Sequence, residues 1–189
     1  IYFAPGLFDG RPKTTPKKEV MTGSSWAWVA IDPRAREPLE TERPRMLAAL
    51  RSHVPAPTII VDSGRGYWGF WQFREPLLDP GAVENINRGL CAALDGDPSG
   101  CNINKVARLP GTINSKTGER ACVVEDHPEL LYSPDDFAPP VAAAAPGEAV
   151  RVADLAELNV PERLRTIIEQ GRLPDEPKEG DDSRSAWLF

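Results

Sequence analysis

The stretch DSGRGYWGFW, residues 62–71, decides the fold, because a glycine-rich turn opens there into an aromatic segment. The turn, residues 63–66, separates two apolar segments at 58–62 and 67–73 that are rich in β-branched and aromatic residues. This pattern predicts two strands joined as a hairpin, with glycine where a positive φ is needed. Since alternate side chains of a strand share one face, Phe70 is expected in the core.

The segments around this hairpin alternate between strand and helix patterns. Further strands are predicted at 1–4, 25–31 and 121–125, and helices at 39–53 and 80–94. The second helix places apolar residues on one face (Val83, Ile86, Leu90 and Leu94). A polar loop is predicted at residues 95–103. By themselves these patterns indicate a domain of mixed α and β structure.

The composition changes near residue 138. Residues 139–150, PPVAAAAPGEAV, have the low complexity and the prolines of an interdomain linker. Residues 151–189 contain short helical patterns, one of which the chain end interrupts. We therefore expect a domain at 1–138, a linker at 139–150 and a small helical domain at 151–189. The chain begins with Ile1 rather than Met, and it is interpreted as a fragment of a longer protein.

Charge and cysteine content narrow the class of protein. The net charge of -6 argues against a protein built mainly to coat nucleic acid. An enzyme that acts on nucleic acid remains compatible with this charge, because acidic metal ligands and a few placed cations can share one site. The three cysteines lack the spacing of a zinc site and predict buried thiols in a reducing cytosol (Cys91, Cys101 and Cys122). No apolar run is long enough to predict a membrane span.

Two stretches are candidate anion sites. In residues 108–116, RLPGTINSK, Arg108 and Lys116 bracket a Pro-Gly turn that also carries Asn114, and fixed cations with hydrogen-bonding groups suit a triphosphate. A solvated surface turn is the alternative. In the hairpin, glycines allow backbone N–H groups to face an anion, and an aromatic residue such as Trp68 suits stacking on a base.

A third candidate is the acid at the end of strand 25–31. Asp32 shares a face with position 30, and two carboxylates there would hold a pair of metal ions. Position 30 is alanine, so this pair is incomplete. A further acid comes from Asp95 or Asp97, in the loop after the second helix.

In this order the motifs resemble those of the archaeo-eukaryotic primase superfamily, in particular the primase-polymerases of phages and plasmids. Residues 30–32 are similar to its strand-borne Asp-x-Asp, residues 63–68 to its SGxGxH segment, and residues 108–116 to its Arg-Leu-Pro-Gly-Thr-x-Asn-x-Lys segment. Asp97, chosen over Asp95, corresponds to the family's single acid after a helix. The resemblance covers residues 1–138.

The resemblance implies an α+β fold, with an RRM-like antiparallel sheet and flanking helices, followed by a small C-terminal helical domain. It implies a nucleotidyltransferase of DNA replication that makes primers on single-stranded DNA and extends them from nucleoside triphosphates, with Mg²⁺ or Mn²⁺ in a two-metal site. Asp32 and Asp97 would bind the metals beside Ala30. The nucleotide would be bound by Ser63, Gly64, Arg65, Gly66, Trp68, Arg108, Asn114 and Lys116. The expected location is the cytoplasm of a host cell, and a helicase domain is expected elsewhere in the full-length protein.

The sequence departs from the family pattern at two positions. Trp68 occupies the place of a histidine, and Ala30 the place of a metal-binding aspartate. Losing one of three carboxylates should sharply weaken metal binding, so this chain is predicted to be catalytically impaired. Ala30 is interpreted as an inactivating change in an active parent, a natural inactive member being the alternative. The alternative function is a non-catalytic module that binds nucleotide or single-stranded nucleic acid. An initiator that nicks DNA through tyrosine would need a His-x-His pair, which the sequence lacks, and ranks last.

Overall fold

An antiparallel sheet is the centre of the fold. The computed structural model describes residues 1–11 and 14–137, so the predicted linker and C-terminal helical domain lie outside the described residues. The strands run in the order β2 (Gly6–Phe8), β3 (Met21–Ile31), β5 (Tyr67–Leu77), β4 (Ile59–Asp62) and β7 (Cys122–Asp126). A short strand, β8 (Leu131–Tyr132), pairs in parallel with β5. The hairpin predicted at residues 58–73 is thus confirmed as β4 and β5.

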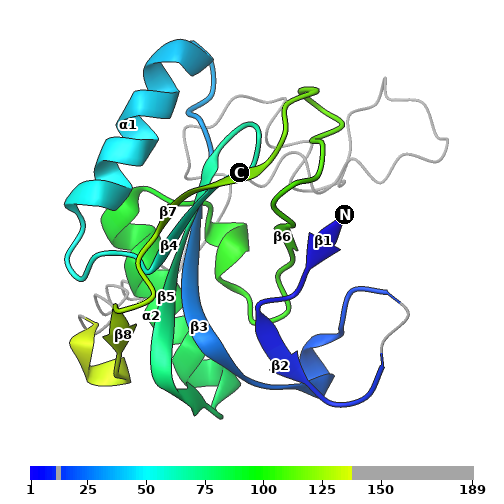
Figure 1. Cartoon of the computed structure of the whole chain (residues 1–189). Coiled ribbons are helices and arrows are strands. Elements are labelled where there is room, and N and C mark those ends of the chain that lie inside the picture. Colours follow the sequence, from blue (N-terminus) through cyan, green and yellow to red (C-terminus); the bar gives the residue numbers. More distant parts are fainter. Residues whose placement is uncertain (12–13, 138–189) are drawn as a thin grey trace, which may run out of the picture. The chain divides into compact units, whose positions relative to one another are not determined.

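Two helices cover one face of this sheet, α1 (Leu39–Ser52) and α2 (Pro80–Leu94) (Figure 1). A Cβ added at Gly69 of β5 would lie 2.7 Å from Cδ2 of Leu50, so α1 packs directly on the strand backbone at this glycine. The predicted apolar face of α2 is buried, and the predicted bounds of this helix are confirmed. Its first turn is capped by Asp79, which accepts hydrogen bonds from the N–H groups of Gly81 and Ala82.

The opposite face of the sheet carries a small two-stranded ribbon, β1 (Tyr2–Phe3) and β6 (Ala107–Arg108). The ring of Phe3 lies 6.0 Å from that of Phe70, which follows Gly69 and therefore points away from the helices. Phe70 is 5% exposed, as predicted. The sheet is therefore covered on both faces, by helices on one and in part by the ribbon on the other.

The predicted α+β class is confirmed, and the elements from β3 to α2 follow the β-α-β-β-α order of an RRM-like unit. Several details differ from the sequence-based expectation. Strand β3 begins at Met21 rather than residue 25, because its first residues pair with the unpredicted β2. The predicted polar loop at 95–103 contains a 3₁₀ helix, η2 (Pro98–Cys101), and Ile103 is fully buried. Cys122 is exposed, whereas Cys91 and Cys101 are buried free thiols as expected. In the part of the chain that is described, no helix has the length and apolarity needed to cross a membrane.

Candidate functional site

The turn between β4 and β5 fits tightly between two other segments. A Cβ added at Gly66 would lie 2.2 Å from the carbonyl oxygen of Ile31 and 3.1 Å from Oδ1 of Asp32. On the other side, Gly64 has a φ of +86°, and a Cβ there would lie 2.9 Å from Cβ of Asn114. The turn therefore touches the end of β3 with one glycine and the 108–119 loop with the other.

The glycine N–H groups of this turn are used within the turn. The N–H of Gly64 donates to Oδ1 of Asp62 at 2.7 Å, and that of Gly66 to Oγ of Ser63 at 3.2 Å. The sequence suggested that these groups face an anion. The structure gives the glycines a different role, which is to let three backbone segments approach closely.

Replacing Gly66 with alanine is expected to lower the free energy of unfolding by about 1–3 kcal/mol, because the new methyl group overlaps the Ile31 carbonyl. Denaturant titration measures this change. Gly81→Ala, in the first turn of α2, is the matched control: its Cβ would lie 3.2 Å from Oδ1 of the exposed Asp79, which can shift, so stability should change by no more than about 1 kcal/mol in either direction. Equal stability of the Gly66 variant and the parent chain would contradict the close packing.

The three expected metal-site positions lie together at the end of β3. The N–H of Asp97 donates to the carbonyl oxygen of Ala30 at 2.8 Å. A Cβ added at Gly100 would lie 3.4 Å from Cβ of Ala30 and 4.0 Å from Cβ of Asp97, so both side chains border the same glycine. Asp32 follows Ile31 at the strand end and reaches the turn at Gly66. Among the described residues no cluster of three or more metal-ligating side chains occurs.

Asp97 is held as a charged group at the start of η2. Its carboxylate accepts hydrogen bonds from the N–H and the Oγ of Ser99, at 2.9 and 2.6 Å, and lies 3.4 Å from Nζ of Lys105. Partial burial raises the pKa of Asp97, but the Ser99 hydrogen bonds and the Lys105 charge outweigh burial and bring the pKa below its ordinary value. Asp97 is therefore an anion at neutral pH.

Asp95, the other candidate acid, is engaged elsewhere. It ends α2 in the left-handed conformation, with a φ of 54°, and its carboxylate lies 2.9 Å from Nη2 of Arg34. The structure thus brings Asp97 to Ala30 and pairs Asp95 with an arginine.

A buried glutamate that the sequence did not single out fixes the segment after Asp32. Glu42 of α1 is 4% exposed, and its carboxylate accepts hydrogen bonds from the N–H of Arg34 at 2.8 Å and from Nη2 of Arg45 at 2.6 Å. The hydrogen bond from Arg45, followed by the one from Arg34, lowers the pKa of Glu42 from its ordinary value of 4.5 to about 2. The i,i+3 spacing of Glu42 and Arg45 was the available signal, but such pairs are common on exposed helices.

The stability of the domain should depend on Glu42 at acidic pH. Because folding lowers the pKa of Glu42, its contribution is complete above about pH 4.5 and is lost as the pH falls towards about 2. Denaturant midpoints measured across this range should fall more steeply for the parent chain than for Glu42→Gln. The comparison isolates Glu42, since the other acids titrate alike in both proteins. Parallel curves would contradict this role.

Arg108 of β6 is a nearly buried cation that bonds only to neutral groups. Arg108 as a whole is 9% exposed. It donates to the carbonyl oxygen of Ile113 at 3.0 Å, to the hydroxyl of Tyr2 at 2.8 Å and to Oδ1 of Asn114 at 3.2 Å. The guanidinium also lies 4.8 Å from the centre of the Tyr2 ring. Within the described residues no carboxylate pairs with it, so its charge is uncompensated there.

Asn114 links Arg108 to the glycine-rich turn. Its Nδ2 donates to the carbonyl oxygen of Ser63 at 3.0 Å, while its Oδ1 accepts from Arg108. Arg65 and Lys116 are exposed on the turn and the loop, and neither forms an ion pair with a described residue. The predicted nucleotide-binding residues of the two stretches are thus in contact or on neighbouring surfaces.

Trp68 of β5 lies on the sheet beside the expected metal-site positions. It is paired across the sheet with Ala30 on one side and Val61 on the other. It is 8% exposed, and its ring stacks on Phe70 with centroids 5.7 Å apart and planes inclined by 10°. Most of its surface is therefore already covered by protein.

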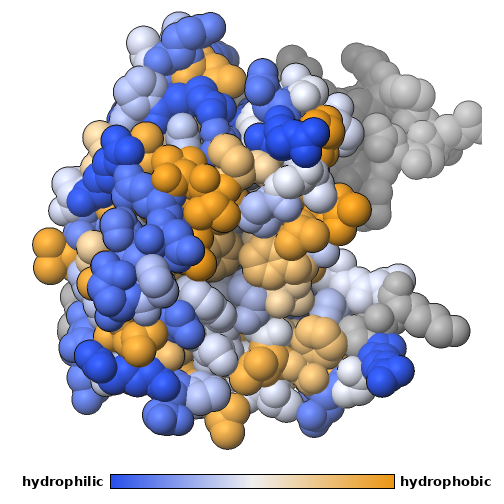
Figure 2. Space-filling view, in the orientation of Figure 1, coloured by the Kyte–Doolittle hydropathy of each residue, from blue (hydrophilic) through white to orange (hydrophobic). Residues whose placement is uncertain are grey.

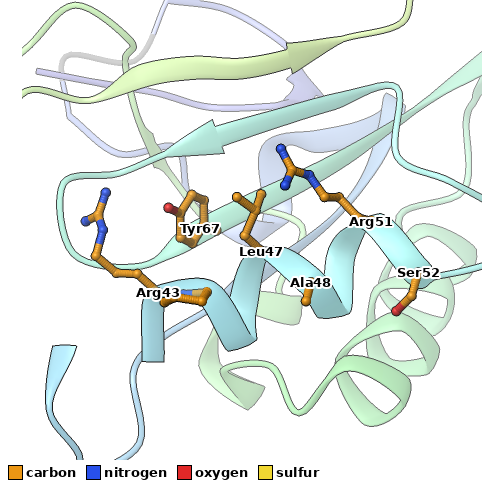
Figure 3. Close-up of a pocket in the computed structure, with 7 residues that line it drawn as sticks. Arg43, Leu47, Ala48, Arg51, Ser52 and Tyr67 are labelled. Carbon is orange, nitrogen blue, oxygen red and sulfur yellow. The ribbon is translucent and has the colours of Figure 1, made fainter. Parts of the chain in front are cut away.

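A separate groove of about 570 Å³ lies along α1 beside Tyr67 (Figure 3). Two arginines line it, and each is paired with a carboxylate, Arg43 with Asp62 and Arg51 with Glu125 at 2.5 Å. Because these charges are compensated, the groove is a weaker candidate for phosphate binding than the Arg108 region.

Comparison with solved structures identifies the fold as that of the archaeo-eukaryotic primases. The chain aligns with the primase domain of the cyanophage S-2L primase-polymerase at 21% identity and a TM-score of 0.56, over 71% of this chain and 65% of that one. Two structures of the primase RepB′, one of its catalytic domain with initiator DNA, align over 57% of this chain at 17% and 18% identity, with TM-scores of 0.44 and 0.40. The sequence matches no family model and no curated protein.

Proposed function

We propose that this domain is the catalytic core of a DNA-replication primase-polymerase, which makes primers and extends them on single-stranded DNA and is impaired here by Ala30. One observation carries the proposal. Ala30 and Asp97 are joined by a backbone hydrogen bond at the end of β3, beside a turn that connects Asp32 to the Asn114–Arg108 pair. An acidic half and a cationic half thus adjoin, as metal-dependent transfer from a triphosphate requires.

The acidic half fits divalent cations only in part. Mg²⁺ and Mn²⁺ prefer carboxylate oxygens, and Asp32 and Asp97 supply them, whereas position 30 offers a methyl group. With aspartate at position 30 the three carboxylates would hold both ions. When bound, the ions would neutralise charge on the triphosphate and on the attacking oxygen.

The cationic half would position the triphosphate. Arg108 has an uncompensated charge and donors left over after its three hydrogen bonds, and Lys116 and Arg65 add exposed cations nearby. Ser63, Gly64, Gly66 and Asn114 would hold these cations in place, with Trp68 below them. The partners in this proposal are nucleoside triphosphates and a single-stranded DNA template, in the cytoplasm of a host cell if a phage or plasmid encodes the protein. A helicase domain would lie elsewhere in the full-length chain.

A non-catalytic module that binds nucleotide or single-stranded nucleic acid is the second candidate. The methyl group at position 30 and the buried Trp68 in place of a histidine favour it. The experiment that separates the two restores aspartate at position 30 and measures nucleotide incorporation on single-stranded DNA with Mg²⁺ or Mn²⁺.

A further inference from the structure

An apolar pocket of about 270 Å³ lies between the sheet and the β1–β6 ribbon. Its floor and walls include Phe70, Trp26, Val61 and Val123 of the sheet and Phe3 and Pro5 of the N-terminal segment. In Figure 2, hydrophobic residues border a hollow between β7 and β6 on this face. The rings of Phe3 and Trp26 lie 6.0 and 6.4 Å from that of Phe70, so the pocket is walled by aromatic faces and edges.

The sheet register places this pocket at a defined distance from the metal-site position. Ala30, Trp68, Val61 and Val123 are consecutive cross-strand partners on β3, β5, β4 and β7. At about 4.8 Å per strand, Val61 on the near side of the pocket is roughly 10 Å from Ala30, and Val123 on its far side is roughly 14 Å away. A nucleotide whose reacting phosphate is at position 30 carries its own base within one sugar of that phosphate. The far side of the pocket, at Val123, therefore lies beyond that base, where a base further along a strand can enter.

One cation beside the pocket, and two more on the turn after β4 and on the 108–119 loop, suit the backbone of such a strand. Arg120 donates to the carbonyl oxygen of Gly111 at 2.8 Å, next to the pocket residue Pro110. Arg65, Lys116 and Arg120 have no ion-pair partner among the described residues, whereas most cations on α1 and α2 are paired. An apolar, aromatic pocket flanked by free cations matches a base attached to a sugar-phosphate chain.

We infer that this pocket binds an unstacked base of a single-stranded nucleic acid, away from the metal-site position. The inference rests on the proposed function, because it takes the strand to be the template or primer of that site. The base lies against Phe70 and between Phe3 and Val123, while the cations at the rim contact the phosphates. Binding of a base in this pocket needs no metal ion, so the chain with Ala30 binds the strand there as well.

The first test changes the ligand and leaves the protein as it is. A short fluorescein-labelled oligothymidylate and an abasic strand of the same length are titrated with the chain by fluorescence anisotropy at fixed salt. Since stacking one base on aromatic residues strengthens binding roughly five- to hundredfold, the abasic strand should bind that much more weakly. Equal dissociation constants for the two strands would overturn the inference.

The second test fills the pocket. Val123 is 48% exposed on β7, so Val123→Trp can place its ring in the pocket without disturbing the core. The variant should bind oligothymidylate roughly fivefold or more weakly and the abasic strand as the parent does. Leu78→Trp, at a 72% exposed residue away from the pocket, is the matched control and should behave as the parent.

Each remaining outcome has a definite meaning. If Val123→Trp weakens the binding of both strands equally, the pocket is not a base site. If the variant changes only the sedimentation coefficient of the free protein, the pocket is instead a contact between copies of the chain. If both strands bind with the same affinity and Ala30→Asp still gains activity, the pocket inference fails and the proposed function stands. If neither strand binds and Ala30→Asp stays inactive, both fail.

Discussion

Replacing Ala30 with aspartate is expected to raise nucleotide incorporation on single-stranded DNA at least about a hundredfold in Mn²⁺ or Mg²⁺. A complete set of carboxylates allows metal ions to stabilise the transition state by several kcal/mol, and each 1.4 kcal/mol is a factor of ten in rate. The scaffold for the new side chain is present, because Asp97 is already bonded to the backbone of residue 30 and Gly100 leaves room beside it.

Thermal unfolding gives a second readout of the same change. Without metal, a third carboxylate beside Asp97 and Asp32 adds like charge, so Ala30→Asp should melt at a lower temperature than the parent. Mn²⁺ should raise the melting temperature of this variant and have little effect on the parent. Ala30→Asn, which has the same shape and no charge, is the matched control and should gain neither activity nor a metal response. A folded Ala30→Asp variant that binds triphosphate yet stays at background incorporation would establish the non-catalytic module instead.

Replacing Arg108 with glutamine is expected to weaken triphosphate binding at least tenfold and to lower the free energy of unfolding by about 2–4 kcal/mol. The loss of stability follows because Asn114 loses a buried hydrogen bond, and Ile113 and Tyr2 each lose a partly buried one. The loss of affinity follows because the site loses its nearly buried, uncompensated positive charge. Calorimetric titration and denaturant unfolding measure the two effects separately.

Arg108→Lys distinguishes a bound anion from a structural arginine. Lysine keeps the charge but cannot make the guanidinium fork, so affinity should stay above that of the glutamine variant while stability falls in both. Arg74→Gln, at an exposed arginine of β5 outside this loop, controls for the general loss of one charge. If Arg108→Gln unfolds more easily but binds triphosphate as the parent does, Arg108 only supports the loop.

Local patterns in the sequence were sufficient for the central elements. The alternation around Phe70 predicted the hairpin, and the helical spacing of apolar residues from Val83 to Leu94 predicted α2. Strands β2, β6 and β8 have two or three residues each, which is too short for any periodicity to show. They form because partners distant in the sequence complete their hydrogen bonds.

The proximity of some candidate residues could be predicted from the motif order, whereas their environments could not. The motif order placed Asp97 with Ala30, and the structure puts them in contact. The burial of Arg108 could not be foreseen, because its contact with Tyr2 joins residues 106 positions apart. The glycine N–H groups of the turn have local partners, Asp62 and Ser63, because these side chains compete with a bound anion for the same donors.

The hydrogen bond between Asp97 and residue 30 uses the backbone carbonyl, which every amino acid at that position provides. This hydrogen bond is therefore available whether residue 30 is alanine or aspartate. In genetic terms, an alanine codon that ends in a pyrimidine becomes an aspartate codon by one base change. A lineage with this domain can thus lose the third carboxylate and regain it by single point mutations, without remaking the fold on either path.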